Sequence, residues 1–232
     1  MMLKYFSSGL LCFFVTMLGG CATAPIPKIS FSGIKTLGVV SACGGTITRE
    51  SWGMIVFDND LTYGDISDWK LDDFIFDTVK KLSPQFDVQR IVVATSNPNS
   101  GEPFRGGMNV EDRVKTAIIS AQPNVDAYLV IARGVGMAPS GNPSDTTSGM
   151  GIFSHGLWRF VHASCEVTLL DGRTGNRLGR SLASGIVQIP SELRHDKWED
   201  YNSEERKIIL EDLKKAVEIG FKESLSNINN TK

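Results

Sequence analysis

The spacing of apolar residues changes several times along the chain, and each change predicts an element of secondary structure. Three runs rich in Val, Ile and Leu, at residues 35–42, 88–95 and 125–136, are typical of buried strands. Between these runs, apolar residues recur every three or four positions, which predicts two amphipathic helices. The apolar faces of the two helices are formed by Leu71, Phe74, Ile75, Val79 and Leu82 in the first and by Val110, Val114, Ala117, Ile118 and Ala121 in the second.

Polar residues and prolines mark where these helices should begin and end. Asp68 or Ser67 can cap the first helix, and the Ser-Pro pair at 83–84 stops it. Asn109 can cap the second helix, which has to close before Pro123. The predicted order up to residue 136 is therefore strand, helix, strand, helix, strand.

The next part of the chain combines a long polar segment with a pair of strands. Residues 134–151 are small and polar, and they predict a loop of a length that is often functional. Residues 162–170 alternate between apolar and polar side chains, which predicts a strand with one buried face and one face that is wet or meets a partner. A turn whose Gly172 and Gly175 allow positive φ leads into a returning strand at 177–187. The side chains predicted to be buried in the first of these strands are Ala163, Cys165, Val167 and Leu169.

The chain ends in a long amphipathic helix. Ser203 can cap this helix, and Glu204 and Glu205 suit the positive end of its dipole. Its apolar face is formed by Ile209, Leu213, Ala216, Val217 and Phe221. Its exposed face should carry the ion pairs Glu211–Lys215 and Glu218–Lys222.

These elements predict a single domain at residues 34–228. Its class is α/β, with α+β as the alternative, and it should have two or three layers, a mixed sheet and about three helices. Two short β-prone runs in residues 46–57 add a hairpin to this sheet.

The first twenty residues have the pattern of a bacterial signal peptide. Lys4 supplies a positive charge, and the 14 residues after it are uncharged and mostly apolar. As a helix this segment would reach about 21 Å, short of the roughly 30 Å hydrocarbon core, so a cleaved leader is favoured over a permanent span. The segment ends in Leu18-Gly19-Gly20-Cys21, which resembles the lipobox of bacterial lipoproteins.

The lipobox resemblance implies an address and an anchor. In that family the signal peptidase cuts before the cysteine, here Cys21, which carries acyl chains such as palmitate. An Asp in the next position would favour the inner membrane, so Ala22 implies the periplasmic face of the outer membrane. Residues 1–20 are then the signal peptide and residues 21–33 a lipidated tether, with the lipid on Cys21 as the membrane contact. The alternative is an ordinary secretory signal cut near residues 21–24, with an incidental thiol at Cys21.

The predicted domain also resembles a known group of envelope proteins. A strand–helix–strand–helix–strand unit is followed by the hairpin sequence VTLLDGRTGNRLGRS at 167–181 and a closing helix. This arrangement resembles the small α/β domain of the curli secretion lipoprotein, of the lipoprotein activators of penicillin-binding proteins and of the Tol translocation protein. The resemblance implies a non-enzymatic role in assembly or regulation of the envelope.

Composition and motifs exclude several function classes. The chain has 24 Lys and Arg against 26 Asp and Glu, a formal net charge of −2, so there is no basic footprint for nucleic acid. The sequence shows no nucleophile elbow, zinc-protease motif, phosphate loop or dinucleotide fingerprint. A divalent ion could be held by Glu192, His195, Asp196 and Glu199, but such a charged stretch before a helix is usually solvated surface. We therefore expect no catalytic residue, no metal and no cofactor.

Two cysteines remain in the mature chain once Cys21 carries lipid. Cys43 and Cys165 can form a disulfide in the oxidising periplasm. The alternative is two separate buried thiols, each acting as a small apolar side chain.

An aromatic segment is the candidate contact with a partner. Phe153, Trp158, Arg159 and Phe160 follow the long polar segment, and aromatic residues and Arg dominate interface hot spots. Burial of the same residues in the core is the alternative. The sequence thus predicts a lipid-anchored interaction module that meets an unidentified envelope protein, with a periplasmic enzyme or small-ligand-binding protein as the alternative.

Overall fold

The fold is known from a computed structural model, which describes residues 31–52, 60–92, 112, 115–116, 125–138, 146–156, 158–193 and 195–229. The helices are α2 (Leu71–Leu82) and α4 (Ser203–Asn229), with short 3₁₀ turns η3 (Ser67–Trp69) and η4 (Trp198–Asp200). The strands are β1 (Thr36–Ala42), β2 (Thr46–Trp52), β3 (Asp60–Asp65), β4 (Asp87–Arg90), β5 (Ala127–Arg133), β6 (Val135–Met137), β7 (Thr146–His155), β8 (Trp158–Asp171) and β9 (Arg177–Gln188).

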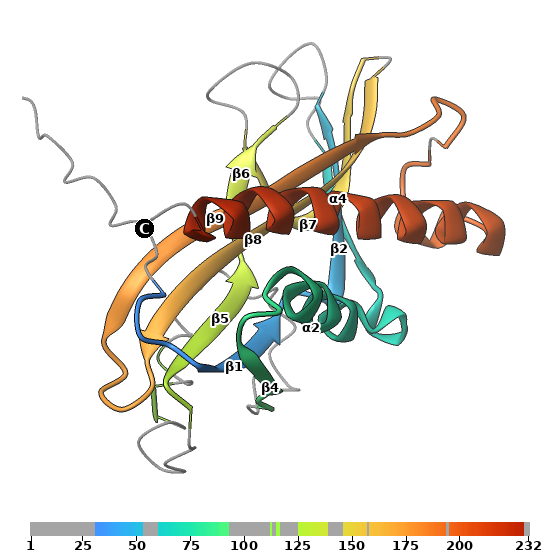
Figure 1. The fold of residues 1–232 in the computed structure, drawn as a ribbon. Helices are drawn as coiled ribbons and strands as arrows, with labels where there is room; N and C mark the ends of the chain where they lie inside the picture. The colour runs from blue at the N-terminus through green and yellow to red at the C-terminus, as the bar shows by residue number, and fades with distance from the viewer. Residues whose placement is uncertain are drawn as a thin grey trace, which may run out of the picture.

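Strand β8 organises the sheet (Figure 1). Along one edge it pairs with β9 over almost its whole length. Along the other edge its first half pairs with β7 and its second half with β5. The sheet therefore divides into two branches, β7-β2-β3 and β5-β1-β4, and the branches separate where Gly134 N donates to Ser164 O at 2.9 Å. The parallel pairs β1–β4, β1–β5 and β2–β7 make this a mixed sheet, as the sequence predicts.

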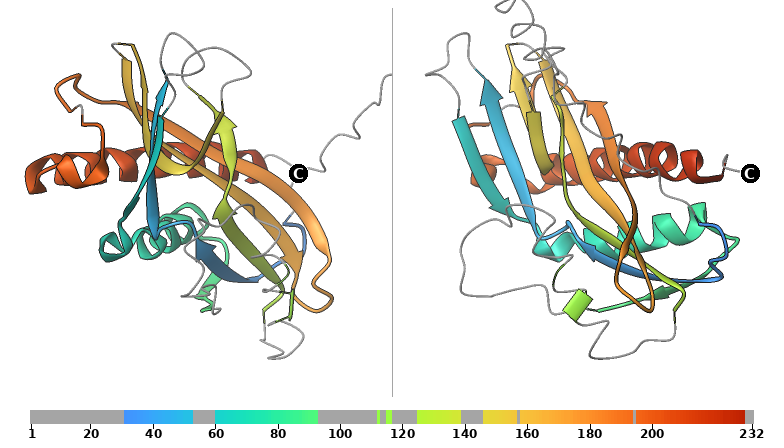
Figure 2. Two further views of the ribbon diagram at one scale, coloured as in Figure 1. Left: turned by 180° about the vertical axis from the view of Figure 1, so that it is seen from behind. Right: turned by 90° about the vertical axis from the view of Figure 1, so that its left-hand side faces the viewer.

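Both described helices lie on one face of this sheet, which we call the inner face (Figures 1 and 2). The predicted apolar positions of α2 and α4 join the inward side chains of β1, β5, β7 and β8 in one core. The opposite face, the outer face, carries a second small apolar cluster around Tyr128 and Leu170. Burial of apolar surface, which contributes roughly 25 cal/mol per Å², stabilises this arrangement.

A flap of two short strand segments covers the middle of the outer face. Gly149 has a φ of 66°, a conformation that favours glycine, and the part of β7 before it pairs with β6 instead of β2. We call residues 135–137 and 146–148 the flap. Its position is fixed by Gly136, where an added Cβ would lie 2.3 Å from Ser164 Oγ and 3.0 Å from Ser184 Oγ. The flap backbone therefore lies directly on the hydroxyl groups of β8 and β9.

Several sequence predictions are confirmed at the level of elements. Strands lie within residues 35–42 and 125–136, helix α2 covers the first predicted helix, and the hairpin β8–β9 follows the predicted alternation. The predicted buried residues of the last helix are all buried, as are Ala163, Cys165, Val167 and Leu169. The predicted second helix falls largely outside the described residues, although Asp112, Lys115 and Thr116 are helical. Two complete helices are thus described where about three were expected.

Other predictions are wrong in position. Much of the segment 134–151 is not a loop, because β6 and the first half of β7 form the flap there; residues 139–145 lie outside the described part. Of the predicted strand at 88–95, the described residues show β4 at 87–90 and no strand at 91–92, while 93–95 lie outside the described part. Within 46–57, β2 is described at 46–52, and its hairpin partner is β3 at 60–65. The polar face of β8 is not wet either, because the flap covers Ser164.

The helix caps and surface ion pairs also differ from the prediction. Helix α2 has no side-chain cap, and Lys70, in the left-handed conformation, precedes it. The N-cap of α4 is Asn202 and not Ser203, since Asn202 Oδ1 accepts from the backbone N–H groups of Glu204 and Glu205. The predicted helix pairs are replaced by Glu211–Lys214, Asp212–Lys215 and Lys81–Glu218.

The turn between β8 and β9 uses its two glycines differently. Gly175 has a φ of 68°, as predicted, but Gly172 is not among the glycines with positive φ. Gly172 is needed for space instead, because an added Cβ would lie 2.0 Å from Val125 O.

Candidate functional site

The predicted aromatic segment forms part of the outer face at the β7–β8 hairpin. Strand register places Phe153 directly opposite Phe160 and His155 opposite Trp158. The rings of Trp158 and Phe160 are stacked, with centroids 6.3 Å apart and an interplanar angle of 3°. On the neighbouring strand, Trp52 contacts Phe153 with a centroid distance of 6.0 Å. We call Trp52, Phe153, Trp158 and Phe160 the aromatic patch.

Exposure is unequal within the aromatic patch. Trp158 is 57% exposed, whereas Phe153 is fully buried and Phe160 is half-buried. Phe153 therefore acts as the base of the patch and Trp158 as its most accessible ring. A stacked, partly supported tryptophan offers a large apolar area with little side-chain freedom left to lose on binding.

Arg159 does not belong to this surface, contrary to the sequence prediction. Because successive side chains of a strand alternate between faces, Arg159 lies on the inner face, where it is only 4% exposed. Its guanidinium donates to the carbonyls of Gly156 at 3.3 Å and Trp158 at 3.0 Å. The structure therefore brings three of the four predicted contact residues together and places the fourth on the other side of the sheet.

A buried carboxyl group adjoins the aromatic patch. Glu50 lies opposite Phe153 in the β2–β7 register and is buried. Burial raises the pKa of its carboxyl group, and hydrogen bonds from the Ser148 backbone and the Trp52 side chain offset part of this rise. Glu50 thus links the aromatic patch to the flap through Ser148.

A buried histidine lies next along the outer face. His162 is fully buried, and within the described part of the chain neither ring nitrogen has a partner at hydrogen-bond geometry. The pKa of His162 is lowered to about 3, chiefly by burial and in small part by the charge of Arg133, whereas the nearby Gly149 carbonyl acts in the opposite direction. The ring is therefore neutral at physiological pH.

The sequence prediction missed Glu50 and His162. The sequence held one signal for His162, which occupies a polar position in the alternating run 162–170. What could not be read from the sequence is the tertiary packing that buries this position.

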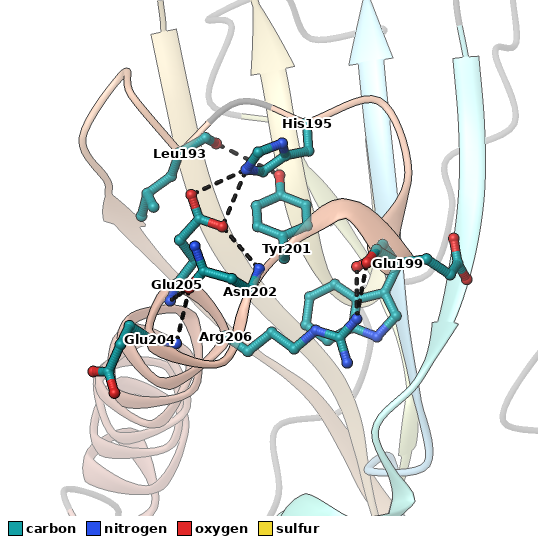
Figure 3. Close-up of polar contacts among 9 residues, drawn as sticks. Leu193, His195, Glu199, Tyr201, Asn202, Glu204, Glu205 and Arg206 are labelled. Carbon is teal, nitrogen blue, oxygen red and sulfur yellow. Dashed lines mark hydrogen bonds and ion pairs between the residues drawn. The ribbon is translucent and has the colours of Figure 1, made fainter.

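The charged stretch before α4 serves to fix the start of the helix (Figure 3). His195 Nε2 lies 3.0 and 3.1 Å from the two carboxylate oxygens of Glu205, and its ring packs edge-on against Tyr201. Glu205 also accepts from Asn202 N at 2.9 Å, which completes a capping box with Asn202. These bonds to His195 and Asn202 lower the pKa of Glu205.

The other residues of this stretch take structural positions. The Arg206 guanidinium lies over the Trp198 ring, 4.9 Å from its centroid, and donates to the carbonyls of Trp198 and Glu199. Asp196 pairs with buried Arg49 at 3.3 Å. Across the described residues, no group of three or more His, Cys, Asp or Glu side chains is arranged to hold a metal ion.

Cys43 and Cys165 are both free thiols in the inner core. Register places Arg133 opposite Cys165, and Cys43 follows Ala42, the partner of Ala132. The thiols are close enough to interact, and burial raises the pKa of Cys43 well above its usual value, with the Cys165 hydrogen bond adding to this rise. The Cys43 thiol is therefore not an activated nucleophile.

The residues of the predicted lipobox, Leu18, Gly19, Gly20 and Cys21, lie outside the described residues. None of the helices in the described part of the chain is both long and apolar enough to span a membrane.

Comparisons with known proteins give only distant structural likenesses. No protein-family profile and no curated protein sequence matches the chain. The lipoprotein GNA1162 of Neisseria meningitidis aligns at 14% identity over 76% of this chain and 93% of its own, with a TM-score of 0.32. The hypothetical protein CT253 of Chlamydia trachomatis aligns at 7% identity over 84% and 96%, with a TM-score of 0.38. Protein XCC0632 of Xanthomonas campestris, family DUF330, aligns at 10% identity over 86% and 84%, with a TM-score of 0.35.

Proposed function

We propose that this protein is a lipoprotein of the bacterial outer membrane whose domain docks an envelope protein on the outer face of its sheet. The lipobox sequence at residues 18–21 supports the anchor, since it stands where the apolar leader stops. Several acyl chains on Cys21 would hold the protein stably, because each buried CH₂ contributes about 0.8 kcal/mol to membrane binding. The tether to residue 33 spans at most about 40 Å when extended, so the domain would work close to the membrane surface.

Docking rests on the exposure of Trp158. Tryptophan is among the residues that contribute most to protein interfaces, and it gains most where neighbouring side chains keep water away from its contact. The stacked Phe160 and the buried Phe153 provide that support here. A non-enzymatic interaction module is the role that this arrangement supports best.

The docking proposal is tested by crosslinking in intact cells followed by purification of the protein and mass spectrometry. We expect the parent to capture one envelope protein and the Trp158→Ala variant to lose it. Ile208→Ala is the matched control, because Ile208 is an exposed apolar residue on α4 and lies away from the aromatic patch. An adduct that persists in Trp158→Ala, or that disappears equally in Ile208→Ala, would contradict docking at the patch.

The anchor is tested separately by metabolic labelling with a radioactive fatty acid. The parent should incorporate label and the Cys21→Ala variant should not. Equal labelling of the two proteins would reject Cys21 as the lipid site, and it would leave the docking proposal to its own test.

A second candidate function is binding of a small ligand beneath the flap. The observation that favours it is the pair of buried titratable groups, Glu50 and His162, whose pKa values are both shifted by burial. Screening the purified protein by thermal shift tests this candidate. A ligand whose stabilising effect disappears in His162→Gln but persists in Trp158→Ala would favour it over docking at the aromatic patch.

A further inference from the structure

Strand β9 forms one edge of the sheet in the part of the chain that the structure describes. Within the described residues β9 pairs with β8 alone, over a strand of 12 residues. Natural edge strands are usually shortened or protected by lysine, proline or a bulge on the strand itself. β9 has no lysine, proline or acidic residue, and one of its two arginines, Arg180, is ion-paired with Glu166 of β8. The bulge of β9 lies at Leu178, six residues before Ser184, so the strand is regular from Gly179 onward. This edge is therefore suited to accept another strand.

Apolar side chains are exposed on both sides of this edge. On the outer face β9 presents Leu182 and Ile186, which lie two residues on either side of Ser184. On the inner side, α4 presents Ile219, which is 48% exposed. Exposed apolar groups gathered along an unpaired strand are typical of an interaction site rather than of solvated surface.

Helix α4 lies directly over the middle of β9. An added Cβ on Gly220 would be 2.8 Å from Ser184 N, and one on Gly185 would be 1.9 Å from Ala216 O. These close approaches fix Ile219 beside the same point of the strand as Ser184. On the other side of the helix, Glu218 pairs with Lys81 of α2 and Lys214 lies over Phe74 of α2. The side of α4 that carries Ile219 therefore faces away from α2.

On that side of α4, a positive and a negative side chain lie at equal distances from Ile219. Lys215 lies one turn before Ile219 and Glu223 one turn after it, and i±4 residues share one face of a helix. The Lys215 amino group bonds to Asp212, yet its side chain is 63% exposed and free to reach a second carboxylate. A two-fold rotation about Ile219 would place Lys215 of one copy opposite Glu223 of another.

We propose that β9 pairs antiparallel with β9 of a second copy of this chain, about a two-fold axis beside Ser184. In this register Leu182 faces Ile186 of the second copy, and Arg180 faces Gln188, so no two arginines are opposed. The two α4 helices would face each other across the two-fold axis, with Ile219 beside its own counterpart. A second copy of this chain fits better than an unrelated strand. When one copy is rotated onto the other about the two-fold axis, Leu182 meets Ile186 and Lys215 meets Glu223. Such isologous two-fold contacts are the commonest form of homo-oligomer.

This inference is independent of the aromatic patch and has its own experiment. Cysteine is introduced in the full chain at one position at a time, and membranes are oxidised with copper phenanthroline and air. Ile219→Cys should yield a disulfide-linked dimer on a non-reducing gel. Ile208→Cys is the control, because Ile208 lies eleven residues away on the same side of α4, about 16 Å from the axis along the helix.

Charge reversal then tests the register. Adding Lys215→Glu to Ile219→Cys should lower the dimer yield about tenfold, and the further change Glu223→Lys should restore it. Circular dichroism confirms that each variant is folded. The proposal is overturned if Ile219→Cys yields no more dimer than Ile208→Cys, or if the folded single and double charge variants give equal yields.

Discussion

At the scale of single residues, His162 shows how burial changes the chemistry of a side chain. Its ring is fully buried, and its pKa falls to about 3. The unfolded chain, in contrast, binds a proton near pH 6.5. Folding therefore excludes a proton from this site at mildly acidic pH, and the stability of the fold becomes linked to pH.

We predict that the free energy of unfolding decreases as the pH falls below about 6.5. Above this pH both states hold a neutral ring; below it only the unfolded state is protonated, until the folded ring titrates near pH 3. Between pH 7.5 and pH 5 the loss due to His162 should be about 2 kcal/mol. Urea unfolding of the parent and of His162→Gln at both pH values measures it.

The control for this prediction is His155→Gln, which changes a histidine at the exposed end of the hairpin. That variant should keep the parental difference between the two pH values, whereas His162→Gln should lose most of it. If parent and His162→Gln show the same difference, the buried ring is not the source of the pH dependence.

A single residue also shows where sequence reasoning reaches its limit. The alternation of residues 162–170 correctly predicts which side chains of β8 face the core, because that pattern is local. The same rule, extended four residues back to Trp158, would have separated Arg159 from Trp158 and Phe160. Composition grouped the three as one hot spot, but the fold divides them between two faces.

At the scale of elements, the start of α4 depends on a small polar network. Asn202 caps the first turn, Glu205 bonds back to Asn202, and His195 holds the Glu205 carboxylate (Figure 3). The sequence predicted the helix and its acidic first turn but placed the cap one residue late, since Ser203 and Asn202 are both good capping residues. Only the backbone geometry distinguishes the two.

Replacing Asn202 by Ala should lower the free energy of unfolding by about 1 kcal/mol, the usual loss for a missing N-cap. Ser203→Ala is the matched control and should change stability by less than about 0.5 kcal/mol. Urea denaturation of both variants checks this. A larger loss for Ser203→Ala than for Asn202→Ala would show that the cap has been assigned to the wrong residue.

The flap is the element that the sequence could not predict. Its segments are short and rich in Gly, Ser and Thr, so they carry no apolar period. They form strands because Gly149, at positive φ, turns the start of β7 away from β2. The glycine backbone at Gly136 can also pack directly against the hydroxyl groups of Ser164 and Ser184. Both conditions depend on residues far apart in the sequence, so the local pattern of apolar and polar residues does not predict them.

At the scale of the whole molecule, the two faces of the sheet differ in what covers them. The inner face is closed by α2 and α4, whereas the outer face carries the flap and the aromatic patch (Figures 1 and 2). Because Trp158 stands on the outer face and outside the core, it should be removable without loss of the fold.

Trp158→Ala should change the free energy of unfolding by less than about 1 kcal/mol, since more than half of the side chain is already in water. Trp198→Ala, at a buried tryptophan packed against Trp69 and Tyr201, should cost about 3–5 kcal/mol. Unfolding curves of the two variants give the comparison. A loss for Trp158→Ala as large as that for Trp198→Ala would make Trp158 a core residue and remove the basis for docking.

The most direct test of docking is site-specific photocrosslinking in intact cells. A photoreactive benzoylphenylalanine replaces Trp158 in one strain and Ile208 in another. The account predicts one discrete adduct with an envelope protein from position 158 and none from position 208. The same adducts from both positions, or none from position 158, would contradict the claim that the aromatic patch is a docking surface.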